Sequence, residues 1–381
     1  MELYKNKEMC TGCTACKNIC PKQAISMVTD SEGFLYPIID ESKCVDCGLC
    51  NVVCPTIGLK EKNKTIVSYI AQNTNEGDLK KSSSGGVVVL LARKILDKGG
   101  SVFGAAFDES LELKHIEVNS VEELDLVLGS KYVQSNPADS FSTVHKLLKE
   151  QKVVMYVGTP CEIEGLSSYL NLKKADTSNL LLVDIMCHGC PSPLVFKKYL
   201  GYRKRIDGGD EFVKINFRDK IKGWRNISNT YTYKNGKEYT ANVDIFFRGF
   251  LRNAYLRPSC YACHFKEIDR VSDITLGDSW SMGSINAGLD NDKGHSFVIC
   301  HTPKGEEAIT SSKDELFLFK VNSKIENGGL YESAYLNPER EKIFKNLEKL
   351  DFDELYNRYF SDKIWLKIRR TLARKRGKTK R

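Results

Sequence analysis

The sequence predicts an α/β protein made of two unlike parts, a short cysteine-rich module followed by a larger body. Eight of the 14 cysteines lie within residues 1–58. From residue 65 on, short apolar runs of strand length alternate with amphipathic stretches, which is typical of an α/β fold. The chain has 381 residues, and because a domain usually contains about 100–200 residues, this length favours more than one domain.

The composition is that of a folded protein whose basic charge is concentrated near one end. Apolar residues make up 41% and charged residues 28% of the chain, which excludes bulk disorder. Residues 363–381 contain ten basic residues and no acidic one, so the formal net charge of +8 becomes −2 for the residues before them. A slightly acidic body offers no surface of the kind that binds nucleic acid.

The basic tail, residues 361–381, has a partly amphipathic pattern. Such a segment could make peripheral contact with an anionic membrane or an acidic partner, but we favour a solvated, frayed terminus. No apolar run approaches the about 20 residues of a transmembrane helix. Residues 1–8 lack the apolar core of a secretion signal. We therefore expect a cytoplasmic protein.

The cysteines of the module repeat one motif. C-x2-C-x2-C-x3-C-P occurs twice, 34 residues apart, at Cys10, Cys13, Cys16 and Cys20 and again at Cys44, Cys47, Cys50 and Cys54. This spacing is typical of bacterial ferredoxins with two 4Fe-4S clusters, in which the fourth thiolate of each run crosses to the other cluster. The crossing rule predicts the ligand sets Cys10, Cys13, Cys16 and Cys54, and Cys44, Cys47, Cys50 and Cys20. Residues 1–58 are thus expected to form a dicluster ferredoxin-like domain.

Two other uses of these cysteines are less consistent with the pattern. A disulfide framework requires an oxidising compartment, and the chain carries no export signal. A zinc site usually takes two widely separated cysteine pairs, whereas here four cysteines follow one another in each run. Between the two runs, residues 24–28 and 35–40 are predicted to form short strands that turn around Gly33.

The body, residues 65–360, follows a charged linker at residues 59–64. We predict strands near residues 66–71, 101–107, 153–157 and 180–185. Helices are predicted near residues 86–97, 121–128, 138–150 and 193–205, with a capping box formed by Ser120 and Glu123. Later segments are richer in strands, including residues 212–217 and a hairpin at Asn235 and Gly236.

Six cysteines remain in the body, and four of them are candidates for a third 4Fe-4S cluster. Cys260 and Cys263 form a C-x-x-C pair, which needs two further ligands, and Cys161 and Cys187 are the candidates. The run from Cys260 to His264 also matches a haem c attachment site, which is normally used after export. We further consider a Cys161 or Cys187 nucleophile beside His188, and expect Cys190 and Cys300 to be small buried apolar residues.

A run of serines and glycines at residues 82–86 precedes a predicted helix. Backbone N–H groups and hydroxyls at such a helix start can bind phosphate, although simple capping of the helix is the commoner use. The chain has neither a G-x-G-x-x-G fingerprint nor a Walker A loop, so neither of these two motifs supports a different nucleotide site.

Several segments together resemble the beta subunits of coenzyme F420 hydrogenase and dehydrogenase. The motifs are KSSSGG (81–86), GSKYVQS (129–135), GTPC (158–161), CHG (187–189), NFRDK (216–220), CxxCHFK (260–266) and DITLGDSW (273–280). The resemblance covers about residues 65–285, with the ferredoxin module fused in front. It implies an α/β flavin-binding body with a more strand-rich C-terminal part.

The resemblance also implies an iron–sulfur flavoprotein, in which FAD exchanges a hydride with coenzyme F420 or another small organic molecule. Matching motifs imply flavin contacts from Ser83, Ser84, Gly85, Gly86, Gly129, Ser130, Lys131, Tyr132 and Gln134. They imply cluster ligands at Cys161, Cys187, Cys260 and Cys263. Lys131, His188 and Lys220 are the candidate catalytic residues, which would steer an anionic substrate or donate a proton.

Three functional hypotheses remain open at this point. The first is an enzyme that receives electrons from ferredoxin or another electron-transfer protein and acts on a small organic substrate. The alternative is a non-catalytic electron-transfer subunit that delivers electrons to a partner enzyme. A third is a structural or regulatory iron–sulfur protein that has lost its flavin. The intact serine–glycine motifs argue against this third hypothesis. The family includes several substrates, so the fold does not fix this one.

Overall fold

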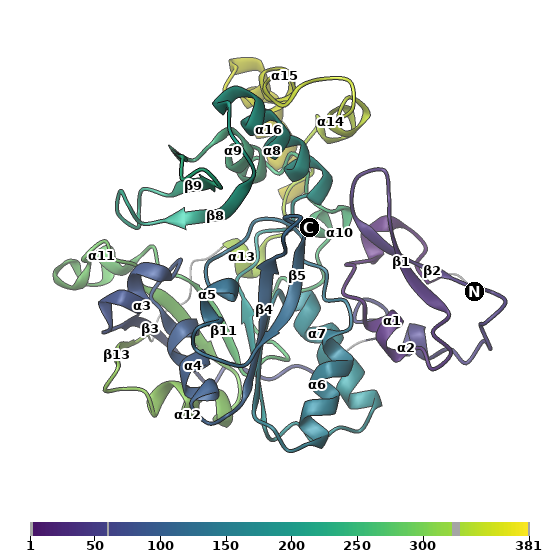
Figure 1. Ribbon diagram of the computed structural model, residues 1–381, viewed down its shortest axis with the longest axis vertical. Helices are drawn as coiled ribbons and strands as arrows, with labels where there is room; N and C mark the ends of the chain where they lie inside the picture. Colours follow the sequence, from purple (N-terminus) through teal and green to yellow (C-terminus); the bar gives the residue numbers. More distant parts are fainter. Residues whose placement is uncertain (1–2, 59–60, 322–327, 380–381) are drawn as a thin grey trace.

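The computed structural model describes residues 3–58, 61–321 and 328–379. The first two residues of the predicted linker 59–64 and the last two residues of the predicted basic tail lie outside the described residues. Figure 1 shows the N-terminal module (purple) on one flank of the body, with the C-terminal helices (yellow) above it.

The N-terminal module is a small two-stranded unit with short helices. Strand β1 (Ile25–Thr29) pairs antiparallel with β2 (Leu35–Ile39), as the sequence predicted. Gly33 has a φ of +87° in the connecting turn, a conformation that costs a glycine little. The helical turns of the module are η1 (Lys7–Met9), α1 (Ala15–Ile19) and α2 (Leu49–Val52).

An eight-stranded mixed sheet forms the centre of the body, in the order β13-β3-β12-β11-β7-β6-β4-β5. Its strands are β3 (Val67–Asn73), β4 (Ser101–Phe107), β5 (Leu113–Val118), β6 (Val154–Gly158), β7 (Leu180–Ile185), β11 (Ile274–Asp278), β12 (Ser296–Cys300) and β13 (Leu316–Lys320). The four central strands β11, β7, β6 and β4 are parallel, and the outer strands are antiparallel. The carboxyl ends of the parallel strands therefore share one edge of the sheet.

Helices cover both faces of this sheet. One hydrophobic cluster joins the sheet to α4 (Val87–Leu96), α5 (Leu124–Val127) and α12 (Pro303–Thr310). A second cluster joins it to α6 (Ser140–Lys149) and α7 (Pro160–Leu172) on the other side. Helix α3 (Glu76–Lys81), helix α11 (Met282–Ile285), the turn η2 (Ala287–Leu289) and helix α13 (Gly328–Tyr331) complete this part.

A second layer stands at the edge where the parallel strands end. A three-stranded antiparallel sheet contains β8 (Phe212–Asp219), β9 (Ser228–Tyr233) and β10 (Glu238–Asn242). Around it lie α8 (Pro193–Asp207), α9 (Ile245–Leu251), α10 (Pro258–Tyr261), α14 (Arg340–Lys345), α15 (Phe352–Leu355), the π-helical turn η3 (Tyr356–Phe360) and α16 (Ile364–Thr379). Their shared core is rich in Phe and Tyr.

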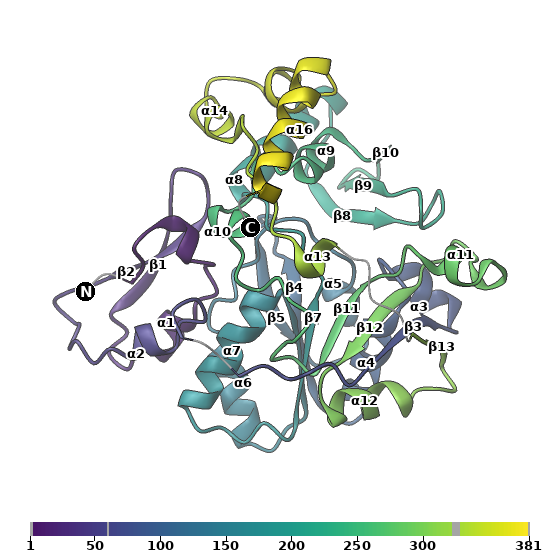
Figure 2. The same cartoon turned by 180° about the vertical axis from the view of Figure 1, so that it is seen from behind.

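The N-terminal module docks on the body through two short segments. Turn η1 contacts α10, and α1 contacts α6 and α7, an arrangement that can be followed from both sides in Figures 1 and 2. Glu32 of the module forms a bidentate ion pair with Arg340 of α14. The module is thus fixed to the body at more than one point.

Most predicted elements of the body are confirmed, but one predicted helix is much shorter than expected and one helix was not predicted. The four predicted strands, the hairpin at Asn235 and Gly236 and helices α4, α6 and α8 are present within a few residues of their expected bounds. The helix predicted over 121–128 is a single four-residue turn. The 13-residue α7 was not predicted.

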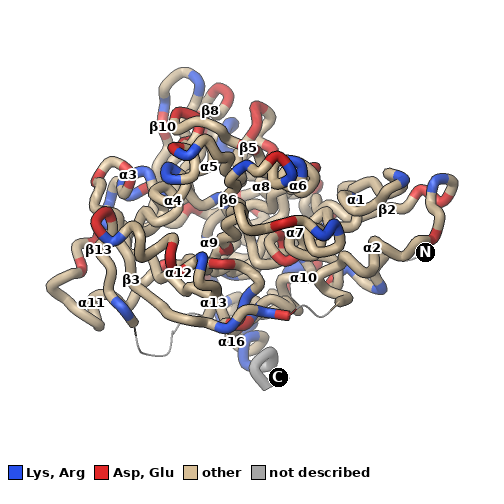
Figure 3. The backbone as a smooth tube through the Cα atoms, turned by 90° about the horizontal axis from the view of Figure 1, so that it is seen from below, with Lys and Arg blue, Asp and Glu red and all other residues tan. Residues whose placement is uncertain are grey.

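The predicted frayed terminus is instead mostly helical. In α16 the side chains of Leu366 and Arg370 are buried, and Arg370 donates a hydrogen bond to the carbonyl of Ser361. Figure 3 shows Lys and Arg interspersed with Asp and Glu over the body. In the part of the chain that the structure describes, no helix has both the length and the apolar content to cross a bilayer.

Candidate functional site

One group of thiols lies where the module meets the body. Cys54 comes close enough to Cys10, Cys13 and Cys16 to affect the ionisation of all three thiols. Burial raises the pKa of Cys13 to about 12, and the neighbouring Cys54 and Cys10 act in the same direction. Buried thiols that repel one another when ionised fit a site for a positively charged iron–sulfur core, because a metal favours the thiolate form.

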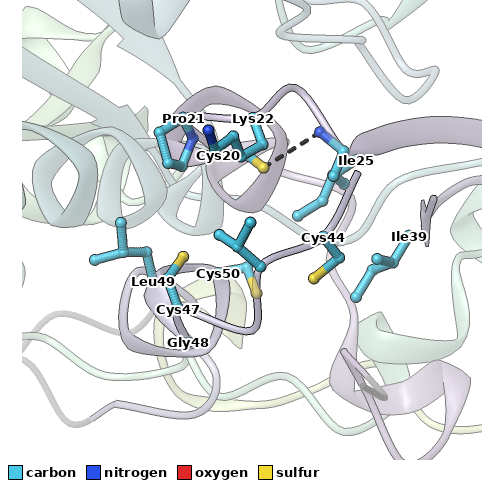
Figure 4. A pocket seen from close by; sticks show the side chains of 12 residues that line it. Cys20, Pro21, Lys22, Ile25, Ile39, Cys44, Cys47, Gly48, Leu49 and Cys50 are labelled. Atoms are coloured by element: carbon cyan, nitrogen blue, oxygen red, sulfur yellow. Dashed lines mark hydrogen bonds between the residues drawn. The ribbon is translucent and has the colours of Figure 1, made fainter. Parts of the chain in front are cut away.

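The other four module cysteines surround a second position. Cys20, Cys44, Cys47 and Cys50 line one pocket, together with Ile25, Ile39 and Leu49 (Figure 4). The main-chain nitrogen of Ala24 donates a hydrogen bond to the Cys20 sulfur at 3.3 Å. The two quartets in space are those that the crossing rule gives, each taking three thiols from one run and one from the other.

The two quartets differ in their exposure to solvent. Cys13 is buried against α7, and its sulfur lies 3.0 Å from the point that a Cβ atom on Gly165 would occupy. A larger residue at position 165 would press on the Cys13 side chain. In the second quartet Cys50 is also buried, but Cys47 is exposed, whereas no thiol of the first quartet is. The first quartet thus faces the body, and the second faces outward.

A third group of thiols is formed by the body alone. It contains Cys161, at the start of α7, the pair Cys187 and Cys190 after β7, and the pair Cys260 and Cys263 in and after α10. Cys161 interacts with Cys187 and Cys263, and Cys263 with Cys260 and Cys187. The Thr159 hydroxyl lies 3.3 Å from the Cys161 sulfur.

Cys190 lies inside this third group, which the sequence analysis did not expect. Its thiol is hydrogen-bonded to those of Cys187 and Cys260, and this hydrogen bonding lowers the pKa of Cys260 to about 7. The main-chain nitrogen of Cys190 also donates to the Cys260 sulfur at 3.3 Å. Cys300, by contrast, is a fully buried core residue of β12, as predicted.

The spacing within each thiol group bears on what it can bind. Over residues 3–58, 61–321 and 328–379, no three Cys, His, Asp or Glu side chains are placed to hold a metal ion directly. In a cubic cluster each thiolate binds its own iron corner, so the ligands stand farther apart than those of one ion.

A cavity of about 280 Å³ lies at the carboxyl edge of the parallel strands. Its apolar wall includes Val102, Phe103, Val127, Leu128 and Phe250, and Cys187, His188 and Cys190 line another part of it. Ligands of open α/β sheets usually bind at this edge. The third thiol group therefore adjoins the cavity in which a small organic cofactor could lie.

Most of the residues implied as flavin contacts line this cavity. They are Ser83, Ser84, Gly86, Gly129, Ser130, Lys131 and Tyr132. The two motifs are joined by a hydrogen bond from the Ser130 nitrogen to the Ser83 hydroxyl at 2.6 Å. Gly85 does not line the cavity, because its backbone packs against Ala71 and Ser296.

Gln134 also lies away from the cavity. Its side chain donates to the carbonyl of Thr11 at 2.9 Å and accepts a hydrogen bond from Arg257 at 2.9 Å. This residue therefore joins the body to the loop around the first cysteine quartet. The other residues of the motif, 129–133 and Ser135, line the cavity, and Gln134 alone reaches the module.

The three candidate catalytic residues have different surroundings. Lys131 lines the cavity, its amine donates to the carbonyl of Leu128 at 2.8 Å, and burial lowers its pKa to about 7. His188 also lines the cavity, and its Nε2 lies 2.6 Å from Oδ1 of Asn253 rather than beside a cysteine. Burial lowers the pKa of His188, which favours the neutral ring.

Lys220 stands outside the cavity and holds its rim. Its amine donates to three carbonyls, those of Leu79, Ser84 and Lys293, at 2.8, 2.7 and 2.6 Å. Three donated hydrogen bonds require the ammonium form. Burial and the neighbouring Arg218 lower its pKa to about 8. The side chain thus fixes the serine-rich loop and does not point at the lining of the cavity.

Several cavity residues were not found from the sequence. His115 donates from Nε2 to the Val157 carbonyl at 3.1 Å, and its Nδ1 lies 2.8 Å from the Ser135 hydroxyl. The ring also stacks on Tyr156. Asp278 lines the cavity and pairs with the buried Arg218 at 2.8 Å. The motif at residues 273–280, which spans β11, contained Asp278, but nothing in the local pattern singled out His115.

Comparison with protein families matches two separate parts of the chain. Residues 151–322 match the C-terminal part of the coenzyme F420 hydrogenase/dehydrogenase beta subunit. Residues 9–57 match the 4Fe-4S dicluster domain. The second match contains all eight module cysteines, so the N-terminal module is an iron–sulfur module. The first match contains all six cysteines of the body.

Curated relatives occur in Methanocaldococcus jannaschii. The beta subunit of an F420-dependent formate dehydrogenase is 22% identical over 260 residues, which cover 65% of this chain and 60% of that relative. An uncharacterised protein is 25% identical over 207 residues, covering 45% of this chain and 57% of its own length. An uncharacterised ferredoxin is 34% identical over 56 residues, 15% of this chain and 71% of its own. The chain spans about 60% of the length of the first two relatives.

Among solved structures, a chain of the F420-reducing [NiFe] hydrogenase complex from Methanosarcina barkeri is similar to this one. The match covers 79% of this chain and 94% of that chain, with 16% sequence identity and a TM-score of 0.48.

Proposed function

We propose that this chain is an iron–sulfur flavoprotein oxidoreductase. Its residues 151–322 match the C-terminal part of the coenzyme F420 hydrogenase/dehydrogenase beta subunit, and its residues 9–57 match the 4Fe-4S dicluster domain. It moves electrons between its N-terminal clusters and FAD held in the cavity. The observation that carries the proposal is the position of Cys187 and Cys190, which belong to the third thiol group and also line the cavity.

The proposed ligand sets follow from the three thiol groups. The first cluster takes Cys10, Cys13, Cys16 and Cys54, and the second takes Cys20, Cys44, Cys47 and Cys50. A third 4Fe-4S cluster takes Cys161, Cys187, Cys260 and Cys263, with Cys190 as a fifth thiol beside it. Lys266, whose amine donates to the Cys187 carbonyl, adds a positive charge that offsets the negative charge of the thiolates.

The order of the clusters follows from their exposure and contacts. The second cluster faces solvent, so it is the one that a protein donor such as ferredoxin can approach. The first cluster lies between the second and the body, against α7 and α10. Those two helices carry Cys161 and Cys260 of the third group. Electrons would therefore pass from the second cluster to the first, then to the third and into the cavity.

The cavity has the features that a flavin site needs. FAD, when bound, would convert single-electron transfer into hydride transfer. Ser83, Ser84 and Gly86 stand at the start of the ten-residue helix α4, where free N–H groups attract a phosphate. Lys131 supplies the cation, and the apolar wall would enclose the ring system. The volume lies close to the lower end of the usual range for small-molecule sites, about 300 Å³.

The roles of the chain's own polar residues follow from their contacts. The neutral ring of His188, held by Asn253, would accept or donate a proton at the cavity. Lys131 in its ammonium form would orient an anionic group. Lys220 keeps the Ser84 carbonyl fixed and so shapes the site without touching the ligand. The organic substrate is coenzyme F420 or another small acceptor.

A second function is favoured by the outward-facing cluster. The exposed Cys47 gives an external protein access to the chain, so the chain could serve as an electron-transfer subunit whose electrons leave to a partner enzyme. The two functions differ in one outcome. An enzyme would reduce coenzyme F420 by itself when supplied with reduced ferredoxin, whereas a delivery subunit would reduce its own flavin but release no reduced product without a partner.

The experiment that tests the proposal is an anaerobic preparation of the full chain. Three clusters correspond to about twelve iron atoms per chain and two to about eight. Flavin is measured in the same sample after release from the protein. We expect about twelve iron atoms and one FAD. A preparation with eight iron atoms and no flavin, even after incubation with FAD, would contradict both the third cluster and the flavin site.

A further inference from the structure

Arg257 is a residue of the body that reaches into the loops of the first cysteine quartet. It directly precedes α10, and its side chain is only 1% exposed. Its Nε donates to the carbonyl of Cys10 at 2.8 Å, and its Nη2 donates to the carbonyl of Leu35 at 2.9 Å. The same Nη2 lies 3.6 Å from the sulfur of Cys10 and donates to it. A full positive charge therefore contacts a thiol that the crossing rule assigns to the first cluster.

The sequence of the module makes room for this guanidinium. Gly12 has a φ of +75°, and a Cβ atom there would lie 2.9 Å from Nη1 of Arg257. Any other residue at position 12 would thus push Arg257 away from Cys10. Gly12, which lies between Cys10 and Cys13, therefore allows the Arg257 side chain of the body to approach and also allows the tight loop.

The charge of Arg257 is not neutralised by its hydrogen-bond partners. These are carbonyl oxygens, the amide oxygen of Gln134 and the Cys10 sulfur, and none is a carboxylate. The Tyr36 and Phe34 rings lie 4.2 and 5.5 Å from the guanidinium carbon and shield it from water. An arginine keeps its proton at all ordinary pH values. The first cluster would therefore sit in a permanent positive field.

We propose that Arg257 raises the reduction potential of the cluster that Cys10 ligates. Reduction adds one negative charge to a cluster, and a buried positive charge in contact with a ligand sulfur stabilises that reduced form. By contrast, the Cys20 sulfur of the second cluster receives a neutral donor, the Ala24 nitrogen. The inference rests on the proposed ligand role of Cys10. Arg257, which directly precedes the helix that carries Cys260, would thereby favour transfer of an electron to the first cluster, next to the body.

A second arginine provides a matched control for a purely structural role. Arg340 joins the same module to the body through its bidentate pair with Glu32, and it also donates to the Leu256 carbonyl at 3.0 Å. It is stacked near Phe344 and Tyr261. Its side chain makes no hydrogen bond to a cysteine sulfur within the described residues. Removing Arg340 therefore weakens the docking of the module without removing charge from the Cys10 sulfur.

The test is an anaerobic redox titration of the full chain, followed by electron paramagnetic resonance of each reduced cluster. Wild type, Arg257→Gln and Arg340→Gln are compared at equal iron content. Cys47→Ser, in the exposed quartet, identifies the signal of the second cluster. We expect Arg257→Gln to move one N-terminal signal to a more negative midpoint potential and to leave the second-cluster signal in place. Arg340→Gln should leave all signals at their wild-type potentials.

Two outcomes would overturn the proposal. One is an Arg257→Gln protein with full iron content and unchanged potentials, a result that leaves the proposed function standing. The other is the same shift in Arg340→Gln, which would mean that docking and not charge sets the potential. If Arg257→Gln loses iron, the Arg257→Lys variant tests the charge effect instead. A lysine, unlike an arginine, can lose its proton and with it its positive charge. Its first-cluster potential should fall as the pH rises from about 7 to about 10, and a flat profile would reject the charge effect.

Discussion

The sulfur of Cys260 accepts a hydrogen bond from the main-chain nitrogen of Cys190 at 3.3 Å, although 70 residues separate them. The loop after β7 and the helix α10 are brought together by this contact at the edge of the cavity. Cys187 and Cys263 join the same group. Cysteines that look unrelated along the chain therefore form one site.

Replacing Cys190 tests whether it is a ligand or a neighbour of the third cluster. We expect Cys190→Ala to keep about twelve iron atoms per chain but to change the paramagnetic signal of one cluster, whereas Cys260→Ser should lose about four iron atoms. Cys300→Ala is the control, since Cys300 lies in the core. It should retain all iron and lose about 1–2 kcal/mol of stability. Loss of four iron atoms in Cys190→Ala would mean that Cys190 itself is a ligand.

The affinity for FAD should depend on pH through Lys131. The pKa of this amine is lowered to about 7, so the ammonium that attracts an anionic ligand is lost above that pH. Flavin-free protein titrated with FAD should show constant affinity below about pH 7. Above it the dissociation constant should rise by up to about tenfold per pH unit, until the pKa of the amine in the complex is reached.

An arginine at this position removes the titration and serves as the control. Lys131→Arg should bind FAD with the same affinity from about pH 6 to about pH 9, because its charge does not change. Equal pH dependence in wild type and Lys131→Arg would show that another group is responsible.

Lys220 is expected to act on the site only through the serine-rich loop. Lys220→Met frees the carbonyls of Leu79, Ser84 and Lys293, so the loop loses its clamp and the dissociation constant of FAD should rise by about tenfold, or about 1.4 kcal/mol. Activity per bound flavin should stay near the wild-type value. Lys222→Met, at a nearby exposed position, should change neither quantity. A normal flavin affinity with much lower activity per flavin would instead make Lys220 a proton donor.

The start of α7 offers a test of local stability. The Thr159 side chain and the Glu162 carboxylate form a capping box, and the Thr159 hydroxyl also touches the Cys161 sulfur. Thr159→Ala should lower the free energy of opening of α7 by about 1 kcal/mol, measured by amide hydrogen exchange in the first turns. Thr310→Ala, at the exposed end of α12, should change it by less than about 0.5 kcal/mol. Unchanged exchange in α7 would mean that the cap contributes nothing.

The sequence was most informative where a spacing has a chemical cause. The cysteine runs of the module identified both quartets, because a thiolate cluster needs its ligands at fixed intervals. The strands β4 and β7 were predicted with their correct bounds, since each is a short apolar run of strand length. The mixed order of the outer strands was not predicted, because pairing depends on distant segments.

The missed helix and the misplaced residues have physical reasons. Helix α7 buries nine of its 13 residues, so it lacks the polar face from which a helical period is recognised; the pair Thr159 and Glu162 was the signal that could have found it. Gln134 belongs to a motif whose other residues line the cavity, whereas its own side chain faces the module. Lys220 is near the cavity in space, and only the hydrogen bonds from its amine to three carbonyls reveal its structural role. Such distinctions depend on contacts between segments more than 100 residues apart.

The most direct measurement is the reduction of bound flavin by reduced ferredoxin, followed by absorbance in a rapid-mixing experiment without oxygen. The wild-type chain should show its clusters reduced first and its flavin afterwards. Cys13→Ser, which damages the first cluster, should allow the second cluster to be reduced while the flavin stays oxidised. If the flavin of Cys13→Ser is reduced as fast as that of the wild type, or if the wild-type flavin is never reduced, the N-terminal module does not supply the cavity with electrons.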